Sequence, residues 1–153
     1  MIVHIVGRPG SGKTTLRLAL ASDLGIPSVD IADQPGHLTD PRTAWASLNA
    51  SLTTSIVVET AGTSAYERGF GRGREVLTIV CAAAERVRSE RLSKRPEVET
   101  ETDYVARMLA IAMPTVSGVP WDGSAPIGGS AYLSLLDHVK RCVAPVEVSY
   151  FDA

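Results

Sequence analysis

A glycine-rich segment near the start of the chain has the residue types and spacing of a phosphate-binding loop. It matches the pattern G-x-x-x-x-G-K-[ST] at every defined position, follows an apolar run and precedes a helical pattern. Glycines let the backbone curl so that successive N–H groups point at phosphate oxygens, and the positive end of the helix adds to this attraction. Lys13 is placed to contact the β- and γ-phosphates, and the Thr14 hydroxyl to bind Mg²⁺. We therefore expect ATP and Mg²⁺ as cofactors, with ATP bound by Gly7, Pro9, Gly10, Ser11, Gly12, Lys13, Thr14 and Thr15.

Three carboxylates follow predicted strands and could take part in phosphoryl transfer. Asp30 ends one strand, Asp33 lies three residues further on, and Glu59 ends another strand. A carboxylate near the γ-phosphate can orient Mg²⁺ or accept the proton of the acceptor hydroxyl. The alternative is that these residues are loop, helix-cap or surface acids. We expect Asp30 to be catalytic and a metal ligand, and Asp33 and Glu59 to contact the acceptor.

Arginines form two groups. Arg91 and Arg95 follow Arg88 by three and seven residues. This spacing puts the three arginines on one face of a predicted helix or just beyond its end. They could form a lid at about residues 85–96 that neutralises charge in the transition state, or a solvated face paired with glutamates. Arg68, Arg72 and Arg74 belong to a glycine-rich loop that could bind an acceptor phosphate or a nucleic-acid backbone, or be a solvated loop.

The elements that must position these residues alternate between strands and helices. Apolar β-branched runs predict strands at residues 2–6, 28–31, 55–59, 76–81 and 146–150. Helical spacing predicts helices from Lys13 to about residue 24, and at 43–52, 82–94, 101–113 and 131–141, with a long loop at 113–130. This alternation predicts an α/β fold in which a parallel sheet lies between helices on both faces, as a three-layer sandwich. Ligands of such folds bind beyond the carboxyl ends of the strands.

The composition narrows the class of protein. The chain has 153 residues, enough for a single domain at 1–153, with a net charge of −2 that gives no general attraction for nucleic acid. Cys81 and Cys142 have no metal-ligand spacing, so we expect two buried free thiols and a cytoplasmic location. His4 lies within an apolar strand and is interpreted as a core or strand-end histidine. No apolar run approaches the roughly 20 residues of a membrane helix.

Several features together resemble the small P-loop kinases, including the adenylate, shikimate and nucleoside kinase families. They are the phosphate loop, the acidic end of the second strand, the turn Glu59-Thr60-Ala61-Gly62 and the pattern R-x-x-R-L-x-x-R-P at residues 88–96. The resemblance covers roughly residues 1–113. It implies that Asp30 holds the acceptor or Mg²⁺, that Gly62 lines the acceptor pocket, and that the three arginines form the lid. The sequence departs from these families in having Glu59, and no clear aspartate, at the end of the third strand.

Three functions follow as hypotheses. The first is an ATP-dependent kinase that phosphorylates a hydroxyl or phosphate of a nucleoside- or nucleotide-like small acceptor. The second follows from a likeness to phage-encoded P-loop kinases that phosphorylate the hydroxymethyl group of modified uracil in DNA, for which the base must leave the stack. The third is a P-loop NTPase switch or binding module. A kinase that acts on a non-nucleotide acceptor, such as a sugar or an antibiotic, is a further alternative. Neither the acceptor, nor the choice between ATP and GTP, nor the oligomeric state follows from the sequence.

Overall fold

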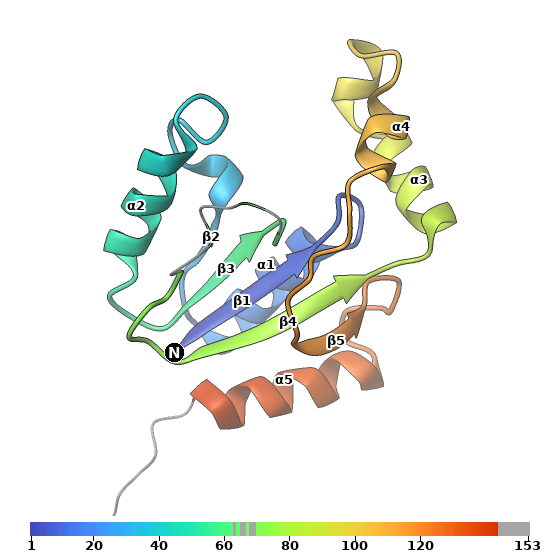
Figure 1. Cartoon of the computed structure of the whole chain (residues 1–153). Coiled ribbons are helices and arrows are strands. Elements are labelled where there is room, and N and C mark those ends of the chain that lie inside the picture. The colour runs from blue at the N-terminus through green and yellow to red at the C-terminus, as the bar shows by residue number, and fades with distance from the viewer. Residues whose placement is uncertain (63, 65–66, 68–69, 144–153) are drawn as a thin grey trace, which may run out of the picture.

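A five-stranded parallel sheet forms the centre of the fold. A computed structural model describes residues 1–62, 64, 67 and 70–143 (Figure 1). Within them the strands run in the order β2-β3-β1-β4-β5, and every neighbouring pair is parallel. The strands are β1 Ile2–Gly7, β2 Ser28–Asp30, β3 Ile56–Thr60, β4 Val76–Ala82 and β5 Val119–Asp122. The predicted α/β fold with a parallel sheet is confirmed.

Helices cover both faces of this sheet. α1 and α5 pack on one face and α2 packs on the other, which gives the three layers expected from the sequence. α3 and α4 stand beyond the carboxyl end of the sheet, joined by the short helix η3 (Figure 1). The α-helices are α1 Lys13–Leu24, α2 Pro41–Ser51, α3 Glu85–Ser93, α4 Tyr104–Leu109 and α5 Ser130–Val143, and the 3-10 helices are η1 Ile31–Asp33 and η3 Pro96–Glu99.

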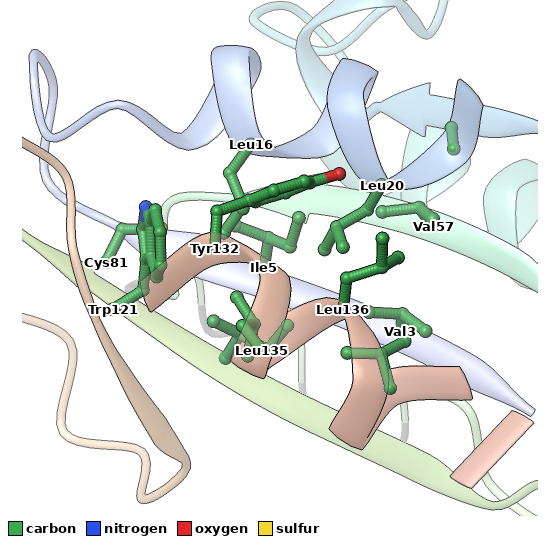
Figure 2. Close-up of a cluster of buried hydrophobic side chains, with 13 residues drawn as sticks. Val3, Ile5, Leu16, Leu20, Val57, Cys81, Trp121, Tyr132, Leu135 and Leu136 are labelled. Atoms are coloured by element: carbon green, nitrogen blue, oxygen red, sulfur yellow. The ribbon is translucent and has the colours of Figure 1, made fainter. Parts of the chain in front are cut away.

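Alternate side chains of the central strands supply two separate apolar cores. Val3 and Ile5 of β1 face α1 and α5, where Leu16, Leu20 and Leu136 pack against them (Figure 2). Ile2 points to the opposite face and packs with Trp45 and Leu48 of α2. Each fully buried side chain of this size contributes roughly 1.5–3 kcal/mol to folding. Because β1 is buried on both faces, its sequence is an almost continuous apolar run.

The strand register brings the chemically active ends of the strands together. Gly7 at the end of β1 lies opposite Cys81 of β4, and Val6 lies opposite Thr60 of β3. Asp30 of β2 lies opposite Glu59 of β3. The phosphate-binding loop and both carboxylates therefore emerge at the same edge of the sheet, as the sequence predicted.

Local signals explain the helix boundaries. Gly12 and Gly25 flank α1 in the left-handed conformation, with φ of 92° and 64°. The Asp40 carboxylate accepts a hydrogen bond from the Thr43 N–H and caps α2, whose first residue is Pro41. The Asp30 carboxylate caps η1 in the same way through the Ala32 N–H.

The segment at 113–130 was predicted wrongly as a long loop. It contains β5, which pairs with β4 from Ile79 to Ala82. Pro120 counts against a strand in the sequence, because proline is rare inside sheets. β5 nevertheless forms because it lies at the sheet edge, where a missing N–H is tolerated. Trp121 is buried against Tyr132 of α5, with their ring centroids 6.2 Å apart (Figure 2).

Other expectations need smaller corrections. The helix predicted at 101–113 is shorter, running from Tyr104 to Leu109, and α3 begins three residues later than predicted. Cys81 and Cys142 are free thiols as expected, but only Cys81 is fully buried. The strand predicted at 146–150 lies outside the described residues. Among the described helices, none combines the length and apolar character needed to cross a membrane.

The buried histidine of β1 makes the stability of the fold depend on pH. His4 Nε2 lies 2.8 Å from Thr60 Oγ1, and its ring lies 4.6 Å from that of Phe70. Burial lowers the pKa of His4 to about 4 from the usual 6.5. Between pH 6.5 and 4 the unfolded chain is protonated at His4 while the folded chain is not. The contribution of His4 to the free energy of unfolding is therefore complete above pH 6.5 and is lost as the pH falls towards 4.

We expect this histidine to account for about 3 kcal/mol of lost stability between pH 7 and pH 4. His4→Gln removes the titration and should flatten the pH dependence of the free energy of unfolding by that amount, measured by urea denaturation. His138→Gln on α5 controls for losing a histidine outside the core. Equal slopes for wild type and His4→Gln would contradict the assignment.

Candidate functional site

The phosphate loop lines a cleft of about 630 Å³ at the carboxyl edge of the sheet. Gly10 and Gly12 have φ of 77° and 92°, which a residue with a side chain rarely adopts. A Cβ on Gly7 would lie 2.6 Å from the Ser11 hydroxyl, so the loop also needs glycine for space. Residues 9–15 contribute to the cleft, together with Asp30, Ile31, Ala32, His37, Glu59, Thr60, Ala61, Arg91, Arg95, Trp121 and residues 123–127.

The loop has polar groups that suit a phosphate ligand. The first N–H groups of a helix have no partner within the helix. In α1, which begins at Lys13, no side chain caps them either. The Ser11 hydroxyl is buried and has no hydrogen-bond partner within the described residues. Lys13 Nζ donates to the Gly7 carbonyl at 2.7 Å. Burial lowers the pKa of Lys13, and the nearby charges of Glu59 and Asp30 oppose that shift. The loop therefore fits the phosphates of a nucleotide.

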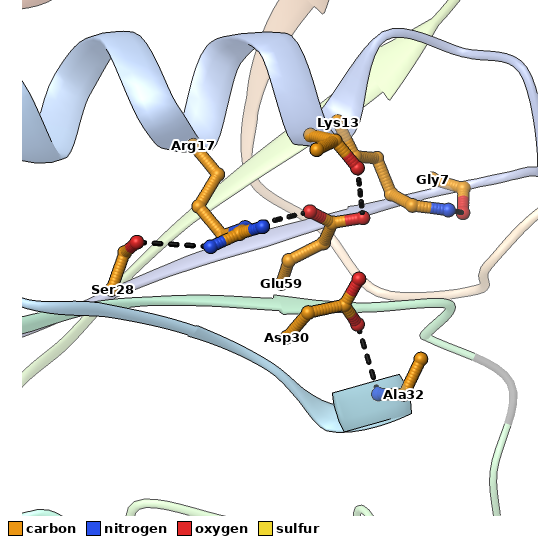
Figure 3. Close-up of polar contacts among 8 residues, drawn as sticks. Gly7, Lys13, Arg17, Ser28, Asp30, Ala32 and Glu59 are labelled. Atoms are coloured by element: carbon orange, nitrogen blue, oxygen red, sulfur yellow. Dashed lines mark hydrogen bonds and ion pairs between the residues drawn. The ribbon is translucent and has the colours of Figure 1, made fainter. Parts of the chain in front are cut away.

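Glu59 belongs to a buried polar network below the loop (Figure 3). Thr14 Oγ1 donates to Glu59 Oε2 at 2.8 Å, and Arg17 Nε donates to Glu59 Oε1 at 2.8 Å. Arg17 also donates to the Ser28 hydroxyl at 2.9 Å. Burial and the charge of Asp30 raise the pKa of Glu59, against the hydrogen bonds from Arg17 and Thr14. Both Glu59 oxygens already have protein partners, so the carboxylate supports Thr14 from below.

The two aspartates predicted for the site lie in different environments. Asp30 lines the cleft, and one of its oxygens accepts the Ala32 N–H at 2.9 Å. Its other oxygen points towards Glu59 (Figure 3). Asp33 is exposed at the end of η1 and does not line the cleft. The structure thus brings Asp30 to the phosphate loop and leaves Asp33 outside.

The turn after β3 is shaped by Gly62. Its φ is 76°, and a Cβ there would come within 2.6 Å of Pro114. The Gly62 N–H donates to Glu67 Oε1 at 3.0 Å. Burial raises the pKa of Glu67. Thr60 and Ala61 line the cleft beside this turn, whereas Gly62, which the resemblance placed in the acceptor pocket, is not a lining residue.

Two of the three arginines that were expected to form a lid donate hydrogen bonds to carbonyl groups of the phosphate loop. Arg88 is buried and donates to the carbonyls of Pro9 and Met108. Arg91 donates to Gly10 at 3.1 Å and to Gly123 at 2.6 Å. The alternative that these two arginines are solvated and pair with glutamates is therefore wrong. α3 packs against the phosphate loop, and backbone carbonyl groups accept the hydrogen bonds of both residues. Arg95 lies beyond the end of α3, donates to the Tyr104 hydroxyl at 3.2 Å and lines the cleft.

The second arginine group lies away from the cleft. Arg72 is exposed in the turn at 70–74 and is not a lining residue. The neighbouring Arg74 donates to the carbonyls of Leu52 and Thr54, so it ties this turn to the end of α2. Arg68 lies outside the described residues.

Sequence reasoning missed three parts of the site. Arg17 follows Thr14 by three residues on α1, a helical spacing that places both on one face. His37 lines the cleft, and its buried Nδ1 has no partner among the described residues. The segment at 123–127 follows β5 and closes the other end of the cleft. Its position could not be inferred because β5 itself was not predicted.

Magnesium fits the donors of this site. The described residues contain no cluster of three or more His, Cys, Asp or Glu side chains that could enclose a metal ion. Mg²⁺ in nucleotide sites is commonly held by one or two protein oxygens, with phosphates and waters completing its coordination. Thr14 and Asp30, both lining the cleft, are such donors.

Comparison with known proteins identifies the fold. No family model and no curated protein matches the sequence. Among solved structures, a gluconokinase from Sinorhizobium meliloti is similar with a TM-score of 0.66 and 18% identity, covering 92% of each chain. An APS kinase from Mycobacterium tuberculosis, in complex with AMPPNP and APS, has a TM-score of 0.64 and 16% identity, covering 91% of this chain and 96% of that one. A shikimate kinase from Aquifex aeolicus has a TM-score of 0.56 and 16% identity, covering 95% and 100%. The chain therefore has the fold of the small P-loop kinases.

Close packing of Gly123 on the phosphate loop generates a prediction. A Cβ at this position would overlap the carbonyl of Ser11. Gly123→Ala should displace the loop, because overpacking of this kind costs about 1–3 kcal/mol. We expect affinity for a non-hydrolysable ATP analogue, measured by calorimetry, to fall about tenfold or more.

Gly128→Ala is the matched control. Gly128 has φ of 88°, but a Cβ there meets nothing within 4 Å. This variant should lose stability through backbone strain and keep the affinity for the analogue. Unchanged affinity in Gly123→Ala would show that the contact does not shape the nucleotide site.

Proposed function

We propose that the protein is an ATP-dependent, Mg²⁺-requiring kinase that transfers the γ-phosphoryl group to a hydroxyl or phosphate of a nucleoside- or nucleotide-like small molecule. The observation that carries this proposal is the complete phosphate loop in a cleft that also contains the Asp30 carboxylate and two arginines. Phosphoryl transfer needs mainly positioning and neutralisation of charge, and these groups supply both.

The nucleotide would lie along the phosphate loop. The N–H groups at the start of α1 would face the phosphates, and Lys13 would leave the Gly7 carbonyl to contact the β- and γ-phosphates. Residues 123–127 line the part of the cleft next to β5, and the base and sugar would occupy that end. Thr14 and Asp30 would hold Mg²⁺, which supplies neutralising charge to the phosphates.

The acceptor would approach from the side of β2 and β3. This end of the cleft is lined by Asp30, His37 and Thr60. The acceptor oxygen attacks the γ-phosphorus while the bond to the ADP oxygen breaks, and the Asp30 carboxylate takes the hydroxyl proton. Arg91 and Arg95 would balance the negative charge of the transferring group, which makes α3 together with Arg95, two residues beyond its end, the proposed lid.

A small-molecule acceptor is favoured over DNA. The gluconokinase, shikimate kinase and APS kinase with this fold are kinases of small molecules. Arg72 and Arg74, two of the three residues considered for contact with a nucleic-acid backbone, do not line the cleft. The net charge of −2 adds no general attraction for a polyanion.

Transfer of labelled γ-phosphate from ATP with Mg²⁺ tests the proposal. The acceptor panel contains nucleosides, nucleoside monophosphates, gluconate, shikimate, and plain and hydroxymethyluracil-containing DNA. We expect label on a nucleoside or nucleotide. Lys13→Ala should lower turnover about 100-fold or more, because it removes the positive charge that contacts the transferring group. Lys140→Ala on the exposed side of α5 should retain full turnover.

The other outcomes of this experiment are also informative. Label on modified DNA alone would overturn the proposed acceptor. Free phosphate without a labelled acceptor, at a rate unchanged by the panel, would support an NTPase in place of a kinase. Normal turnover in a folded Lys13→Ala variant would overturn the assignment of the phosphate loop.

A further inference from the structure

A buried ion pair lies directly below the phosphate loop and has no part in the contacts that the proposed reaction assigns to ATP. It joins Arg17 of α1 to Glu59 of β3, with Nε and Oε1 2.8 Å apart. The side chains are only 11% and 6% exposed, so both charges are largely removed from water. A buried ion pair is weak evidence for stability, because the desolvation of two charges offsets most of their attraction. Its presence beside Thr14 therefore calls for a functional explanation.

The two oxygens of Glu59 have different partners. Arg17 binds Oε1, while Thr14 donates its hydroxyl hydrogen to Oε2 at 2.8 Å. Contacts at both oxygens fix the plane of the carboxylate, which a single contact would leave free to rotate (Figure 3).

Arg17 is itself held in place. Its guanidinium donates to the Ser28 hydroxyl on β2 at 2.9 Å as well as to Glu59. The planar guanidinium can satisfy both partners at once, which a lysine ammonium on a flexible stem does less well. Arg17 thereby connects α1 to two strands of the sheet at the level of the phosphate loop.

The direction of the Thr14 hydroxyl depends on this arrangement. A threonine hydroxyl has one hydrogen and two lone pairs. When the hydrogen points to Glu59, the lone pairs remain available on the side of the cleft that Thr14 lines. A metal ion binds through such a lone pair, so the hydroxyl is oriented for magnesium before any ligand arrives.

We propose that Arg17 is a positioning residue for Mg²⁺, acting through Glu59 to orient the Thr14 hydroxyl. The inference rests on the proposed function, because it assumes that ATP and Mg²⁺ bind at this loop. It differs from the role expected for Glu59 from the sequence, since it assigns the carboxylate to the metal side of the site and not to the acceptor.

The test measures how much Mg²⁺ tightens the binding of a non-hydrolysable ATP analogue. Calorimetric titrations with and without Mg²⁺ give the gain in affinity, independently of any acceptor. Arg17→Lys keeps the positive charge but not the two fixed hydrogen bonds, and we expect it to lower the Mg²⁺ gain about tenfold while leaving metal-free affinity within about twofold. Arg17→Met should lower the gain further.

Arg141→Met provides the matched control. Arg141 lies on the exposed face of α5. Among the described residues it pairs only with Asp137, at 3.5 Å, so this substitution should leave both affinities unchanged. Circular dichroism and thermal melting establish that each variant folds. If Arg17→Met does not fold, Arg17→Lys alone decides the outcome.

A double-mutant cycle with Thr14→Val shows whether Arg17 acts through the hydroxyl. If it does, Arg17→Lys should have no further effect on the Mg²⁺ gain in the Thr14→Val background. An equal effect in both backgrounds, or an unchanged gain in Arg17→Lys alone, would overturn the inference. Failure of the wild-type protein to bind the analogue at all would instead overturn the proposed function. Wild-type binding without any Mg²⁺ gain would overturn the positioning role alone.

Discussion

The parallel register of β1 with its two neighbours is the constraint on which the site depends. Because β1 pairs with β3 and β4 in parallel, the carboxyl ends of all three strands lie at one edge of the sheet. β2 adds Asp30 opposite Glu59 at the same edge. The apolar residues of β1 are buried on both faces, so a one-residue slip in register would move each side chain from the core that it fits into the opposite core. Packing that stabilises the fold therefore also fixes the geometry of the cleft.

Arginines hold the phosphate loop from two directions. From α3, Arg88 and Arg91 donate to the carbonyls of Pro9 and Gly10 on the outer side of the loop. From below, Arg17 acts on Glu59, which accepts from Thr14. These hydrogen bonds fix the conformation of the loop, and the N–H groups at the start of α1 have no side-chain cap. Such preorganised donors can stabilise developing negative charge without rearranging during the reaction.

The cleft combines residues from both cores and both ends of the chain. β2 and η1 supply Asp30, while β5 and the segment after it supply Trp121 and residues 123–127. Trp121 packs against Tyr132, and Tyr132 also hydrogen-bonds Asp23 of α1. α5 therefore supports the far wall of the cleft and the helix that carries Lys13. The proposed nucleotide end of the site is therefore formed by residues 121–132 as well as by the phosphate loop.

The sequence alone determined the parts of this protein in which a short segment specifies its own conformation. The phosphate loop, its flanking strand and α1, the ends of β2 and β3, and the α/β class all follow from local spacing and apolar periodicity. Tertiary structure decided the rest. Pro120 argued against a strand until its place at the sheet edge was known, and Arg88 could not be distinguished from a solvated arginine until α3 was seen to pack on Pro9. The partner of Arg17 is 42 residues away, and only the pairing of strands brings Glu59 to it. Contacts of this kind are set by packing between distant segments, which local sequence patterns do not encode.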